Sequence, residues 1–126
     1  MATTLPISPE AMGAYRATAR QRLAQERPRA ALRREQAWIL ARSLATLLRE
    51  RFGASRVAVF GSLVHEDCFT PWSDLDLAVW GLRPEDAFRA LGVAMDMGGP
   101  IAVDLVDADA CRPALRAAIE EEGVEV

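Results

Sequence analysis

Hydrophobic residues recur along the chain at two different spacings, and the spacing changes near residue 55. Before that point the clearest apolar stripe follows a helical repeat, formed by Leu40, Leu44, Leu47, Leu48 and Phe52. After it, short runs rich in β-branched and aromatic residues alternate with polar segments, which is typical of buried strands. The pattern therefore predicts helices first, and then a small sheet with helices packed on it.

The first half of the chain is expected to hold two helices. Ser8-Pro9-Glu10 is typical of a helix start, with a hydroxyl cap, a proline and an acid, so a helix should run toward Glu26. Pro28 lacks an amide donor and restricts the residue before it, which predicts a break or kink there. A second helix should end at Gly53. Four arginines of that helix are left for solvent or a partner, namely Arg33, Arg34, Arg42 and Arg49.

The second half predicts three strands, at Arg56–Phe60, Leu75–Trp80 and Ile101–Val106. Two more helices are expected, one from Pro84 toward Met97 and one from Asp109 or a neighbour through Glu122. The residues after Gly123 are expected to add a short edge strand. This order predicts an α/β (α+β) domain with a small mixed sheet and packed helices.

Length and composition limit the class of protein. At 126 residues, with 51% hydrophobic and 26% charged residues, the chain fits one folded unit and not a disordered segment. We predict an N-terminal Arg-rich helical extension over residues 1–54, packed on a domain over residues 55–126. No apolar run of about 20 residues and no secretory pattern occur, so a cytoplasmic protein without a membrane segment is expected. Cys68 and Cys111 are too few and too distant for a disulfide framework or a metal knuckle.

Charge is divided unevenly along the chain. Residues 1–56 carry a net charge of +7 and residues 57–126 a net charge of −10, and every basic residue is arginine. A solvated helical face and a surface that binds phosphate or a partner protein both fit this division. Nucleic-acid binding stays open but is not favoured.

Three aspartates and one turn are the candidates for chemistry. Asp74 and Asp76 flank Leu75 at the start of a predicted strand, and alternation places their carboxylates on one face. Asp104 lies inside an apolar strand, where a lone charge is costly, so pairing of the two strands would bring three acids together. Such a cluster fits Mg²⁺ or Mn²⁺. Gly61-Ser62 follows a strand, and its backbone N–H groups and hydroxyl could face a phosphate.

These residues have structural alternatives as well. Asp74 and Asp76 could be a strand-edge cap and a solvated acid, and Asp104 could be a buried acid bonded to backbone N–H groups. His65, the only histidine, is expected to be a surface loop residue rather than a base or ligand.

The run Val59-Phe60-Gly61-Ser62, followed by Ser73-Asp74-Leu75-Asp76-Leu77 and the later Asp104, resembles the minimal nucleotidyltransferases of the DNA polymerase β superfamily. The resemblance covers about residues 55–126. It implies that Asp74, Asp76 and Asp104 are catalytic residues that hold Mg²⁺, and that Gly61 and Ser62 bind the triphosphate of ATP or another nucleoside triphosphate. The spacer from Leu63 to Ser73 is one residue longer than the family pattern.

The resemblance implies a metal-dependent nucleotidyltransferase that moves a nucleoside monophosphate, AMP in the leading hypothesis, to an acceptor hydroxyl. Relatives often act as antitoxins beside a helical partner of the HEPN class, which implies a HEPN-like protein partner here. The alternative is a binding module that keeps the fold, has weak or no activity, and docks a partner through its Arg-rich helices.

Overall fold

Helices cover both faces of a small sheet in this computed structural model, which describes residues 8–65 and 68–126. The elements follow in the order α1 (Pro9–Phe52), β1 (Arg56–Phe60), the short 3-10 helix η1 (Gly61–Val64), β2 (Leu75–Trp80), the 3-10 helix η2 (Pro84–Asp86), α2 (Ala87–Gly98), β3 (Val103–Asp107), α3 (Pro113–Glu122) and β4 (Val124–Glu125). The predicted α+β class is therefore confirmed, and so is the short edge strand at the end of the chain.

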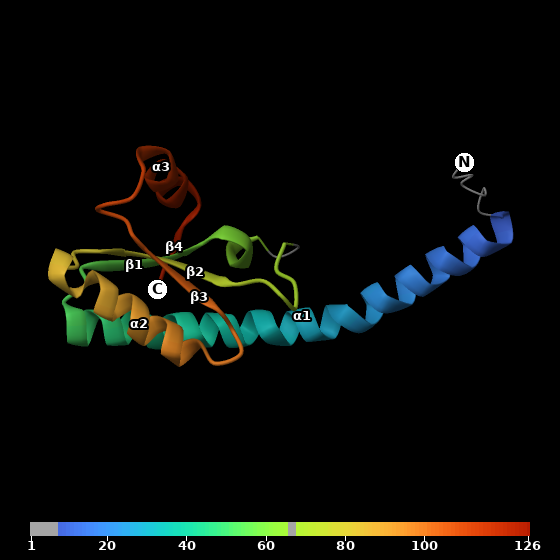
Figure 1. Ribbon diagram of the computed structural model, residues 1–126, viewed down its shortest axis with the longest axis horizontal. Coiled ribbons are helices and arrows are strands. Elements are labelled where there is room, and N and C mark those ends of the chain that lie inside the picture. Colours follow the sequence, from blue (N-terminus) through green and yellow to red (C-terminus); the bar gives the residue numbers. More distant parts are fainter. Residues whose placement is uncertain (1–7, 66–67) are drawn as a thin grey trace, which may run out of the picture.

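The sheet is mixed and has the strand order β3-β2-β1-β4. β1 runs antiparallel to both β2 and β4, whereas β2 and β3 are parallel and are connected through α2. α1 and α2 lie on one face of the sheet and α3 on the other (Figure 1). Alternation along β2 explains these layers, because Leu77 and Val79 join the core beneath α1 while Ala78 packs with Ile119 of α3.

The C-terminal half of α1 is a core helix. Six of its residues are buried and pack with the strands in the larger core cluster, namely Ala37, Ala41, Leu44, Ala45, Leu48 and Phe52. Gly53 ends the helix in the left-handed conformation, with φ of 68°, and β1 begins shortly afterwards. The predicted division into an extension and a domain stays a prediction; the two parts share one core.

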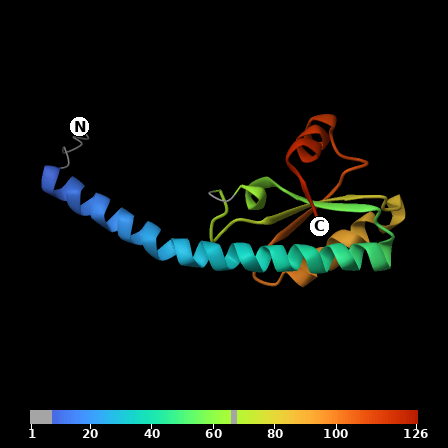
Figure 2. The ribbon, with the colours of Figure 1, turned by 180° about the vertical axis from the view of Figure 1, so that it is seen from behind.

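The N-terminal part of α1 projects away from the sheet (Figures 1 and 2). The predicted start is confirmed, since the Ser8 hydroxyl accepts a hydrogen bond from the Ala11 amide at 3.1 Å. A break or a kink was predicted at Pro28, and the break, with a separate second helix after it, is wrong, because α1 continues through this proline as one helix. The helix axis instead changes direction where blue passes into cyan in Figure 1, the part that contains Pro28. A missing amide donor can bend a helix without ending it.

Two smaller predictions in the second half need correction. α3 begins at Pro113 without a side-chain cap, and Asp109 does not cap it. The Asp109 carboxylate instead accepts the Gly81 amide at 2.8 Å, which links the end of β2 to the loop after β3. β3 begins at Val103, later than predicted. In the described ranges, none of the helices combines the length and the apolarity that crossing a membrane would require.

Candidate active site

Two of the predicted aspartates lie side by side in the sheet. Asp76 is the register partner of Asp104 in the parallel pair of β2 and β3, and on its other side it is the partner of Phe60 in β1. Register partners in adjacent strands project from the same face of a sheet. That face is the one toward α3, because Ala78, two positions along from Asp76, packs with Ile119. The sequence predicted that these acids would meet only if the two strands pair, and in the structure β2 and β3 are paired.

Asp74 lies immediately before β2 and is exposed. A tight turn sets its position, because the Thr70 amide donates to the Ser73 hydroxyl at 2.8 Å and the Ser73 amide donates to the Thr70 carbonyl at 3.1 Å. This pattern of local side-chain and backbone bonds is typical of serine and threonine in turns. The turn therefore fixes the direction of the backbone just before Asp74.

Gly61 closes over the Asp76 carboxyl group. Its φ is +73°, and a Cβ atom at this position would lie 2.4 Å from the Asp76 Oδ2 atom. Both the backbone conformation and the close approach therefore require glycine. Gly61 also opens η1, and the half-buried Ser62 follows it, so the turn that was predicted to face a phosphate stands against the central carboxylate.

The electrostatics of Asp76 reflect this crowding. Partial burial, and then the negative charges of Asp104 and Asp74, raise the pKa of the Asp76 carboxyl from its ordinary 3.8 to about 6. The two neighbouring carboxylates are thus close enough to oppose its ionisation. A positive charge placed among them would reverse this effect and favour the ionised form.

The donor chemistry of these residues fits a hard divalent cation, since carboxylate oxygens are ligands that Mg²⁺ and Mn²⁺ prefer. As the side chains stand, the part of the chain that the structure describes contains no group of three or more His, Cys, Asp or Glu side chains arranged to hold a metal ion. The carboxylates would have to close together to share one. The assignment of Asp74, Asp76 and Asp104 as ligands remains a prediction.

The prediction for His65 agrees with the structure, whereas the prediction for Arg33 does not. His65 is exposed after η1 and its Nε2 atom lies 3.3 Å from a Glu122 carboxylate oxygen, as expected for a surface residue. Arg33 was expected to face solvent or a partner, which is wrong. It is half-buried and donates hydrogen bonds to the carbonyl groups of Ser73 and Pro100. These acceptors lie 40 and 67 residues away in sequence, so no local pattern could indicate them.

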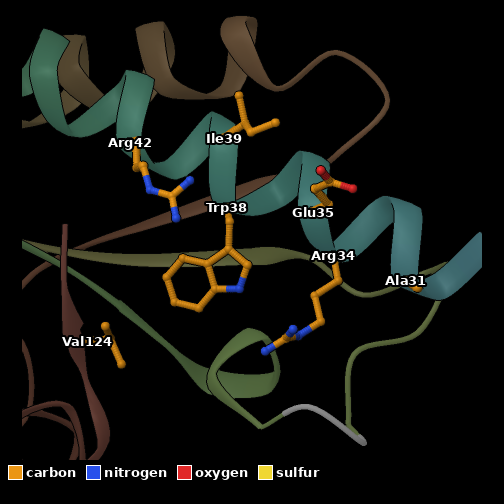
Figure 3. Close-up of a pocket in the computed structure, with 7 residues that line it drawn as sticks. All are labelled: Ala31, Arg34, Glu35, Trp38, Ile39, Arg42 and Val124. Carbon is orange, nitrogen blue, oxygen red and sulfur yellow. The ribbon is translucent and has the colours of Figure 1, made fainter.

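A separate groove lies between α1 and β4, with a volume of about 580 Å³. Figure 3 shows the Trp38 indole between the two elements, with Arg34 extending in the direction of η1 and Val124 across from them. The other residues that line the groove are Ala31, Glu35, Ile39 and Arg42. None of the predicted site residues lines it, and it opens on the α1 side of the sheet, whereas Asp76 and Asp104 face α3.

Comparison with known proteins identifies the fold. No protein-family model matches the chain, and no curated protein matches its sequence. Among solved structures, a protein assigned as a minimal nucleotidyltransferase superposes with a TM-score of 0.60 and 27% identity, over 74% of this chain and 95% of its own. The chain has the nucleotidyltransferase fold. The resemblance inferred from the two motifs is therefore confirmed at the level of the fold.

Two toxin–antitoxin structures share the nucleotidyltransferase fold with this chain. One is a toxin–antitoxin complex with AMP-PNP, with a TM-score of 0.57 and 21% identity over 68% of this chain and 70% of the other. The second contains a tri-AMPylated HEPN toxin of Shewanella oneidensis with its MNT antitoxin, with a TM-score of 0.54 and 19% identity over 71% of this chain and 70% of the other. At these identities the likeness shows the fold alone.

Proposed function

We propose that this chain is a metal-dependent nucleotidyltransferase that transfers AMP from ATP to a hydroxyl group on a HEPN-type protein partner. The observation that carries the proposal is the position of Asp76, which has Asp104 beside it in β3 and Gly61 closed over its carboxyl group. An acidic pair in register beneath a glycine turn is a suitable place for a cation and a phosphate chain. Solved structures that contain the same fold include a toxin–antitoxin complex with AMP-PNP and an MNT antitoxin in complex with a tri-AMPylated HEPN toxin.

Each residue has a distinct part in the proposed reaction. Asp74, Asp76 and Asp104 would hold the divalent cations, which when bound neutralise phosphate charge and acidify the acceptor hydroxyl. The backbone at Gly61 and the Ser62 hydroxyl bind the triphosphate and orient it. The acceptor oxygen forms a bond to the α-phosphorus while the bond to the bridging oxygen breaks, so pyrophosphate leaves. The hydroxyl proton passes to a carboxylate oxygen of Asp104.

Transfer of label from α-labelled ATP to the partner tests the proposal. The intact chain, purified with the partner that accompanies it in its native host, should label that partner in the presence of Mg²⁺. Asp104→Asn keeps the volume and removes the charge, so transfer should fall by roughly a hundredfold or more while ATP affinity stays within about tenfold.

Asp96→Asn is the matched control, because Asp96 is an exposed aspartate on α2 away from the carboxylate pair. It should transfer label at the wild-type rate. Transfer by Asp104→Asn that equals transfer by Asp96→Asn would remove Asp104 from the reaction. Absence of label on any co-purifying partner of the wild-type chain would refute the proposed activity.

A second candidate function is a binding module with little or no activity. The groove that contains Trp38 favours it, because two arginines and two exposed apolar side chains line this concave surface, namely Arg34, Arg42, Ile39 and Val124. Arg42 is exposed and Arg34 half-buried, and arginines at a surface attract an acidic partner with a strength that falls as salt rises. The double variant Arg34→Glu, Arg42→Glu spares the buried bonds of Arg33 and should release the partner. If this variant loses control of the partner in cells while Asp104→Asn retains it, binding is the function.

A further inference from the structure

Arg33 connects α1 to the two backbone segments that lead into the acidic strands. Its Nε and Nη2 atoms donate to the Ser73 carbonyl at 3.4 and 3.2 Å, and its Nη1 atom donates to the Pro100 carbonyl at 3.4 Å. Ser73 directly precedes Asp74, and Pro100 lies shortly before β3. One guanidinium group therefore spans the entries of both parallel strands.

The contact continues along the chain toward the carboxylates. Two residues beyond Ser73, the Leu75 amide donates to the Ala102 carbonyl at 2.9 Å, which joins the same two segments again. Leu75 is the register partner of Val103, and the pair that follows it along the two strands is Asp76 with Asp104. The distance between the two carboxylates thus depends on the hydrogen bonds that join the starts of β2 and β3, and Arg33 of α1 bonds both chain segments just before these strands.

We infer that Arg33 is a positioning residue, which holds the starts of β2 and β3 at the separation that the acidic site requires. This inference deepens the proposed function and rests on it for the role of the carboxylates. The planar guanidinium presents five donors in a fixed arrangement, so it can bond two carbonyl groups at once. A lysine ammonium at the same place is a single point charge on a flexible stem and reaches one of them at a time.

The test compares Arg33→Met and Arg33→Lys with the control Arg29→Met, which removes the same charge from an exposed position one helical turn away. Two quantities are measured on the intact chain. The first is the affinity for Mn²⁺ in the presence of ATP, by calorimetry, and the second is the hydrogen-exchange rate of the Leu75 amide relative to amides of the buried core.

Arg33→Met should weaken Mn²⁺ binding by roughly tenfold or more, the usual effect of losing a residue that supports metal ligands from behind. The Leu75 amide should exchange faster while core amides of β1 keep their rates. Arg33→Lys should fall between Arg33→Met and wild type in both measurements, and Arg29→Met should stay within about twofold of wild type.

Three results would overturn the inference. An unchanged Leu75 exchange rate or an unchanged Mn²⁺ affinity in Arg33→Met would show that the contact does not position the site. Equal acceleration of Leu75 and of the core amides would show a general loss of stability instead. If the wild-type chain binds no Mn²⁺, the proposed function fails, and Leu75 exchange alone then decides whether Arg33 fixes the two strand entries.

Discussion

Replacing Gly61 with alanine separates two demands that the turn places on this residue. The first is backbone strain, because φ of +73° costs an alanine about 1–2 kcal/mol. The second is the Asp76 carboxyl group, whose Oδ2 atom lies 2.4 Å from the position of the new Cβ and has to move. Displacing a packed group of this kind costs about 1 kcal/mol or more. We therefore expect Gly61→Ala to lose about 2–4 kcal/mol of unfolding free energy.

Gly53 provides a matched control within the same chain. Its φ of +68° imposes the same backbone strain, but no atom lies within 4 Å of an added Cβ. Gly53→Ala should therefore lose only about 1–2 kcal/mol in urea unfolding. The excess loss in Gly61→Ala should also shrink when Asp76 is itself changed to alanine, because the obstructing carboxyl is gone. Equal losses at the two glycines, or an excess that survives in the Asp76→Ala background, would refute the contact.

Three further predictions follow from the site and the core. Mg²⁺ or Mn²⁺ at about a hundred times its Kd should stabilise the wild-type chain by about 2.7 kcal/mol in thermal melts, and the Asp74→Asn, Asp76→Asn double variant should lose this shift. A pKa of about 6 for Asp76, above 3.8, means that the folded state holds this proton more tightly, so the free energy of unfolding falls as pH rises between these values. Without metal, the stability of Asp76→Asn relative to wild type should thus increase from pH 4 to pH 7, and a flat difference would contradict the raised pKa. Leu44→Ala should cost about 2–5 kcal/mol because Leu44 is fully buried, whereas Ile39→Ala, exposed on the same helix, should cost about 0.5 kcal/mol or less.

The strands were predictable because their hydrophobic runs are short and are bounded by turn residues. The run that became β2 has buried residues on both faces, so its sequence is almost continuously apolar apart from Asp76. The candidate site was marked by Asp76 together with Asp74 on the other side of Leu75, and by Asp104, the lone charge inside the apolar run Ile101–Val106. The proximity of Asp76 to Asp104, by contrast, depends on β2 and β3 being neighbours in register, which only the fold determines.

The failures of prediction have physical reasons. Pro28 removes one backbone donor, but it lies inside a helix of 44 residues whose C-terminal half is fixed by the core, and the helix bends rather than stops. Arg33 was assigned to solvent or a partner, because helical spacing only distinguishes the apolar face of a helix from its other faces. Its acceptors are backbone carbonyls of distant loops, and a carbonyl carries no signal in the sequence.

The projecting part of α1 also changes how the molecule moves in solution. A compact chain of 126 residues has a radius of gyration near 14 Å, and about 20 helical residues beyond the core reach roughly 30 Å further. Friction rises with such elongation at constant mass. A single copy should therefore elute early from a size-exclusion column, at an apparent mass well above 13.8 kDa, and only a shape-independent method such as light scattering distinguishes this monomer from a dimer.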